Sequence, residues 1–250
     1  MSSTSETGHA KNVANLESLL TICTSYSSSY NPSNANITLA GLTGLLGNAK
    51  AALVAVTDAK ATYDHATNDR EVAFKVLSPL FTKVVNAFDA CGATKQNVAD
   101  ARALNNKMKG VRAGKKIDPA PTDPANPPQE APRNISVSHV SFDSKISYFE
   151  SLIKLLGAEG SYAPNEPDLT LAGLSNFLVS LKTIHQTAIK AAIDLSNARI
   201  NRDQVLYLSD NNLCESAQDV KKYIKSIFGA ASQQYKQVGK IKFSSVPTTV

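Results

Sequence analysis

The chain has 250 residues, of which 42% are hydrophobic and 19% are charged, and its formal net charge is +5. These proportions are typical of a soluble globular protein. No apolar run approaches the roughly 18 residues that a membrane span needs, so we expect no span.

Residues 1–11 have neither the basic region nor the apolar region of a secretory signal peptide, and we predict that they form a disordered tail. The three cysteines, Cys23, Cys91 and Cys214, are an odd number at wide spacing. This usage favours buried thiols in a reducing compartment over a disulfide framework. We therefore expect a cytoplasmic protein.

Residues 12–113 form the first of two predicted helical repeats. A short helix over about residues 13–28 precedes a long one, in which apolar residues such as Leu42, Leu46 and Ala49 recur every three or four positions. The long helix can extend for about 38 residues, until Ser78 and Pro79 end it as the cap and first residue of a third helix. This third helix covers about residues 79–109, with a break expected at Gly92.

Residues 114–136 are predicted to be a proline-rich linker, since the stretch 118–132 holds six of the eleven prolines. Such a segment favours polyproline II over helix or sheet.

Residues 137–243 form the second predicted repeat, and residues 244–250 a C-terminal tail. A short helix at 142–157, a long helix from Leu171 and a third helix at 211–239, interrupted near Gly229, follow the order of the first repeat. The clearest sign of duplication is that residues 29–42 return as residues 161–174, with eight of fourteen positions identical. We predict an all-α fold of duplicated long-helix hairpins forming a pseudo-two-fold helical bundle; two independent bundles are the alternative.

The duplicated segment is a loop that leads into the N-terminus of each long helix. Its shared residues either bind a partner or an anion through free N–H groups, or only help the chain to fold, and we favour folding. The partner-binding candidates are Tyr30, Pro32, Gly41, Tyr162, Pro164 and Gly173.

Arg70 and Arg202 interrupt otherwise apolar stripes and have acidic neighbours, so they are candidates for pairing between the repeats. The pairing candidates are Asp69, Arg70, Glu71, Arg202 and Asp203. A ligand carboxylate or phosphate could use the same arginines, although we favour the structural role.

Basic residues gather near the end of each repeat, within residues 95–116 and 218–243. They either complement helix C-termini or bind phosphate backbones. The nucleic-acid candidates are Lys107, Lys109, Arg112, Lys115 and Lys116.

The chain contains no recognisable catalytic constellation, and we predict no catalytic residue, cofactor or metal site. We expect a non-enzymatic structural or adaptor protein that mediates protein–protein interaction or self-assembly. A nucleic-acid-associated protein that uses the basic repeat ends is the alternative.

Overall fold

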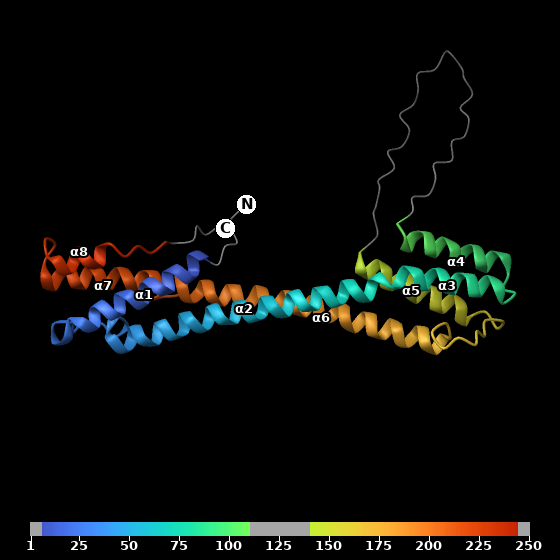
Figure 1. Cartoon of the computed structure of the whole chain (residues 1–250), viewed down its shortest axis with the longest axis horizontal. Helices are drawn as coiled ribbons and strands as arrows, with labels where there is room; N and C mark the ends of the chain where they lie inside the picture. The colour runs from blue at the N-terminus through green and yellow to red at the C-terminus, as the bar shows by residue number, and fades with distance from the viewer. Residues whose placement is uncertain (1–6, 111–140, 245–250) are drawn as a thin grey trace, which may run out of the picture. The chain divides into compact units, whose positions relative to one another are not determined.

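The computed structural model describes residues 7–110 and 141–244, and the regular secondary structure of these residues is entirely helical (Figure 1). The prediction of an all-α protein is therefore confirmed. The α-helices are α1 (Thr7–Ser25), α2 (Leu39–Lys75), α3 (Leu77–Ala90), α4 (Lys95–Met108), α5 (Phe142–Gly157), α6 (Leu171–Asp203), α7 (Leu213–Phe228) and α8 (Gln233–Gly239). Short 3₁₀ turns form η1 (Ser27–Ser29) and η2 (Ala35–Ile37), and a π-helical turn, η3 (Gln204–Leu208), follows α6.

The N-terminal helix begins earlier than the sequence indicates. Residues 7–11, which we assigned to a tail, belong to α1, and His9 is buried there with Nδ1 2.8 Å from the hydroxyl of Tyr207. Asn12 ties the same helix to the C-terminal segment, because its amide donates to the carbonyl of Ser244 and accepts from the N–H of Ser244. The assigned linker, residues 114–136, lies outside the described residues.

The junction between α2 and α3 differs from the prediction at one residue. Ser78 does not cap α3: the helix begins at Leu77, and the preceding residue, Val76, makes no side-chain cap. Pro79 lies in the first turn of α3, where its missing N–H leaves no helical bond unmade. Pro79 is therefore accommodated in the first turn without interrupting α3.

The two glycines expected to interrupt the third helices do so with left-handed backbone. Gly92 has φ +83° between α3 and α4, and Gly229 has φ +88° between α7 and α8. Each following helix has a side-chain cap, from Thr94 to the N–H of Asn97 and from Ser232 to the N–H of Tyr235. Glycine supplies a conformation that most side chains disfavour, and the hydroxyl caps satisfy the first free N–H groups.

The chain folds into two compact units. Unit 1 contains the described residues up to His65 and from Lys190 onward. Its core joins α1, α2, η3, α7 and α8 through one cluster of buried side chains. The largest contributors are Leu16, Leu19, Leu42, Leu46, Leu206, Leu213, Val220 and Ile224.

Unit 2 contains residues Ala66–Ile189, so far as the structure describes them. Its core joins the last turns of α2, the helices α3, α4 and α5, and the first turns of α6. The main contributors are Phe74, Leu77, Phe81, Phe88, Met108, Phe149, Leu152, Leu156, Leu174 and Leu181.

Each unit therefore takes helices from both of the predicted repeats. α1 from the first repeat packs in unit 1 with α7 and α8 from the second, and α5 from the second repeat packs in unit 2 with α3 and α4 from the first. The helices α2 and α6 contribute residues to both units. The division into compact units thus does not follow the predicted division into repeats.

Candidate interaction surfaces

The first of the two similar loops, in residues 29–42, is held by contacts within unit 1. Tyr30 is buried, and its hydroxyl donates to the carbonyl of Ile37 at 2.6 Å. The ring of Tyr30 packs edge-on against Tyr223, with 5.4 Å between the centroids. Pro32 is also buried. Burial raises the pKa of Tyr30 far above its ordinary value, so the hydroxyl stays protonated and remains a donor.

The second loop repeats these contacts in unit 2. The hydroxyl of Tyr162 donates to the carbonyl of Leu169 at 2.7 Å, and its ring meets Phe88 edge-on at 5.9 Å. Burial raises the pKa of Tyr162 to about 12. Pro164 is half-buried. In both loops the tyrosine thus closes the segment by bonding to a carbonyl seven residues later.

The glycine of each loop allows a close backbone approach at the helix N-terminus. The N–H of Gly41 donates to Thr38 Oγ1, and the N–H of Gly173 donates to Thr170 Oγ1, both at 3.1 Å. A Cβ on Gly41 would collide with the carbonyl oxygen of Ala35, and one on Gly173 with that of Pro167. These contacts account for the shared tyrosine, threonine and glycine through folding, and partner binding by the loops remains a prediction.

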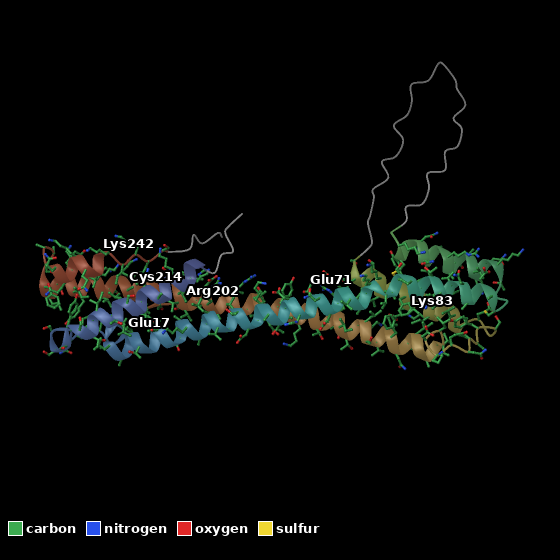
Figure 2. The ribbon with its side chains drawn as sticks, in the orientation of Figure 1. Glu17, Glu71, Lys83, Arg202, Cys214 and Lys242 are labelled. Atoms are coloured by element: carbon green, nitrogen blue, oxygen red, sulfur yellow. The ribbon has the colours of Figure 1, made fainter. Side chains whose placement is uncertain are left out.

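The two stripe-interrupting arginines lie in different units. Arg70 is half-buried in unit 2, with its guanidinium carbon 4.3 Å from the centre of the Phe142 ring. Arg202, labelled in Figure 2, is buried in unit 1 and donates from Nε and Nη2 to one oxygen of Asp203, at 2.9 and 2.8 Å. Arg70 therefore forms a cation–π contact, whereas Arg202 forms a charge-assisted hydrogen-bond pair.

Two of the acidic pairing candidates are more accessible than the arginines. Asp69 and Glu71 are exposed on α2, while Asp203 is half-buried beside Arg202. Pairing between the repeats through these residues remains a prediction.

Among the nucleic-acid candidates, the structure describes Lys107 and Lys109, which are exposed at the C-terminal end of α4. Arg112, Lys115 and Lys116 lie outside the described residues. Two lysines of the second basic stretch make hydrogen bonds within unit 1: Lys221 donates to the carbonyl of Ile241, and Lys222 to Asp219.

Two of the three thiols are buried. Cys23 and Cys214 lie in the core of unit 1, and Cys91 is half-buried in unit 2 (Cys214 is labelled in Figure 2). Desolvation by burial raises the pKa of Cys23 and of Cys214 to about 11. These two thiols are therefore protonated and poorly nucleophilic near neutral pH.

Across residues 7–110 and 141–244, no group of three or more histidine, cysteine, aspartate or glutamate side chains is placed to hold a metal ion. His185 is buried in unit 2 and its Nε2 lies 3.0 Å from an oxygen of Asp143. This pair fixes the start of α5 against α6.

One face of α2 is exposed and consists mainly of small residues. Its positions alternate in steps of four and three, the spacing that keeps side chains on one side of a helix for a partner helix. We call it the small-residue face: Ala40, Gly44, Gly47, Ala51, Val54, Asp58, Ala61 and His65, all exposed. This face was not predicted from the sequence, because the apolar stripe that is buried on the same helix dominates the periodicity. The spacing of its small residues in steps of four and three could have indicated it.

The α2–α3 segment Leu39–Ala90 is also long and apolar enough to cross a membrane, by length and composition alone. It contains an 18-residue window with mean hydropathy 1.5, of which 28% is buried within the structure. The core helix of a soluble protein can reach the same values, and α2 packs Leu42, Leu46 and Ala49 into the core of unit 1.

Comparison of the chain with models of protein families, with curated proteins and with solved structures finds no match in any of the three.

Proposed function

We propose that this is a non-enzymatic structural protein that self-assembles through the small-residue face of α2. The observation that carries the proposal is the continuous exposed run of that face, from Ala40 to His65. Gly44 and Gly47 have open space where a Cβ would stand, and Val54 is 58% exposed. Small side chains in a heptad pattern let a second helix approach closely and bury a long apolar strip.

The small-residue face is complementary to itself when two copies run antiparallel. Its first half holds only glycine and alanine, whereas Val54, Asp58 and His65 give its second half bulk. An antiparallel pair matches small with larger positions in four pairings, each of which occurs twice about the two-fold axis: Ala40 with His65, Gly44 with Ala61, Gly47 with Asp58, and Ala51 with Val54. Such pairing is isologous and generates a closed dimer.

Charge supports the same register. Lys50 lies one helical turn after Gly47, so in the antiparallel pair it lies within about one turn of Asp58 of the second copy. Lys50 also forms a salt bridge of 2.6 Å with Glu17, and half of its side chain remains exposed. In the dimer, the ammonium group of Lys50 would partly neutralise the carboxylate of Asp58 that packs against Gly47 of the first copy.

We further propose that the chain arose by duplication of a long-helix hairpin and that the two hairpin repeats form a pseudo-two-fold helical bundle. The equivalent hydrogen bonds of Tyr30 and Tyr162, and of Gly41 and Gly173, support this relation. Matching buried positions in the cores support it as well: Leu16, Leu19, Leu42 and Leu46 in unit 1 against Phe149, Leu152, Leu174 and Leu178 in unit 2.

Light scattering coupled to size-exclusion chromatography tests the assembly. We expect a dimer, and we expect Ala51→Glu to dissociate it, because the two-fold interface would bury two carboxylates at a cost of about 3 kcal/mol or more. The matched control is Thr183→Glu, which places the same charge on an exposed position of α6, 132 residues later. A protein that is monomeric at all concentrations, or a dimer that Ala51→Glu leaves intact, contradicts the proposal.

Two other outcomes would favour a different function over self-assembly. Co-elution of nucleic acid that is lost at high salt, and that charge reversal at Lys107 and Lys109 removes, would favour the basic repeat ends instead. Flotation with lipid vesicles, abolished by Ala51→Glu but not by Thr183→Glu, would make the small-residue face a membrane contact.

A further inference from the structure

Unit 2 contains a groove where α2 ends and α3 begins. Its volume is about 620 Å³, within the range of about 300–1,000 Å³ that is usual for small-molecule sites. Lys75, Val76, Leu80 and Lys83 form one wall, and Phe177 of α6 contributes to the other. All of these residues belong to unit 2.

The apolar walls of the groove are anchored on the core. Leu80 and Phe177 are half-buried and pack against the core cluster of unit 2, and Phe177 meets Phe149 edge-on at 5.9 Å. Val76, between the two helices, is 52% exposed. Firm walls with an exposed apolar rim give a ligand surface that needs little ordering upon binding.

The charged residues at the groove are mainly cationic. Lys75 and Lys83 are exposed, and no described acid lies within salt-bridge distance of either (Lys83 is labelled in Figure 2). Lys83 follows Lys75 by eight positions in the sequence, with Lys75 at the end of α2 and Lys83 in α3. Asp168 is the one acid among the residues that line the groove, so the lining carries a net positive charge.

The lining side chains also exclude one class of ligand. They contain no amide and no hydroxyl, so they offer few partners for the polar groups of a peptide backbone. An unbranched hydrocarbon chain has no such groups to satisfy, whereas a buried peptide group without a partner is costly. An apolar chain with a single anionic end fits this lining best.

We propose that the groove binds a free alkyl carboxylate, with its chain along Val76, Leu80 and Phe177 and its carboxylate paired with Lys75 or Lys83. This inference does not depend on the dimer, because the groove lies in unit 2 and the small-residue face in unit 1. Its failure and the failure of self-assembly are therefore distinguishable.

Isothermal titration calorimetry of the full chain with decanoate, at concentrations below micelle formation, is the first experiment. We expect saturable binding with one decanoate per chain, and at least about tenfold weaker binding of decylamine, because the cationic end repels the lysines. Absence of saturable binding, or equal affinity for the two ligands, would refute the proposal.

Substitutions then locate the site. Val76→Asp should weaken decanoate binding by about tenfold or more, because it places a carboxylate in the apolar wall. The matched control Val179→Asp changes a similarly exposed valine of α6 that lines neither the groove nor the small-residue face, and it should leave decanoate affinity unchanged. Equal effects of the two variants would overturn the assignment.

Charge reversal gives a second readout that leaves the apolar walls intact. Lys75→Glu and Lys83→Glu together should abolish the preference for decanoate over decylamine, with the helical circular dichroism unchanged. Retention of the preference contradicts the pairing. Flotation of the protein with anionic phospholipid vesicles, in place of decanoate binding in solution, would reject the free carboxylate as the ligand.

Discussion

The substitutions Gly41→Ala and Gly173→Ala test whether the duplicated loops are folding elements. Helix propensity alone predicts that alanine stabilises a helix by up to about 1 kcal/mol relative to glycine. The structure predicts the opposite sign at these two positions. A Cβ on Gly41 would meet the carbonyl oxygens of Ala35 and Asn36, and one on Gly173 would meet that of Pro167.

The size of the expected stability loss depends on which atoms the new Cβ would displace. The atoms in the way are backbone oxygens, and the loop that carries them is held by the tyrosine bond to Ile37 or Leu169. Overpacking of this kind costs about 1–3 kcal/mol, which exceeds the propensity gain, so we expect a net loss of up to about 2 kcal/mol at each site. Gly8 is the matched control, because it lies in the first turn of α1 with no atom within 4 Å of its Cβ position.

Urea unfolding followed by far-ultraviolet circular dichroism measures all three variants. We expect Gly8→Ala to be neutral or more stable than the parent, and the two loop variants to be less stable. If Gly41→Ala and Gly173→Ala behave like Gly8→Ala, the close approach does not constrain the loops, and our structural account of the duplicated glycine is wrong.

Three further predictions concern the loops, the thiols and the unit composition. Tyr30→Phe and Tyr162→Phe should each lower the free energy of unfolding by about 1–2 kcal/mol in urea titrations, since each leaves a carbonyl without its donor; unchanged stability would show that the bonds are dispensable. Cys23 and Cys214 have pKa values raised by burial from 9.0 to about 11, so the stability that their protonated thiols contribute should be complete below pH 9 and lost as the pH rises through about 11. Urea midpoints against pH check this, and the midpoint of the Cys23→Ala, Cys214→Ala double variant should fall less steeply between pH 9 and 11 than that of the parent, although the buried tyrosines keep some dependence at higher pH. Cleavage at a protease site introduced into residues 111–140 should leave the two fragments associated on size exclusion, because both cores contain helices from both fragments; separation of the fragments would contradict the shared cores.

Much of the local structure could be predicted from the sequence. Helix positions are indicated by the apolar periodicity of α2 and α6 and by the glycines that follow α3 and α7. These signals can be read from the sequence because each depends only on residues that are close together in the chain. The error at Ser78 has a local cause as well, since proline is tolerated throughout the first turn of a helix and so did not mark the cap.

The candidate surfaces depend on contacts between residues that are distant in the chain. The groove forms only where Val76 and Leu80 meet Phe177, about one hundred residues later in the sequence. The spacing of the small-residue face can be seen in the sequence, but its exposure depends on which stripe of α2 the other helices cover.

The sequence by itself therefore determined that the chain is helical, roughly where most of its helices lie, and that similar segments precede its two long helices. Only the tertiary structure decided that α1 packs with α7 and α8, and α5 with α3 and α4. The physical reason is that the free energy gained by burying an apolar stripe is roughly proportional to the buried area and depends little on direction. One amphipathic helix can therefore pack against any complementary stripe. Close packing of the actual side chains, which no local pattern contains, selects the partners.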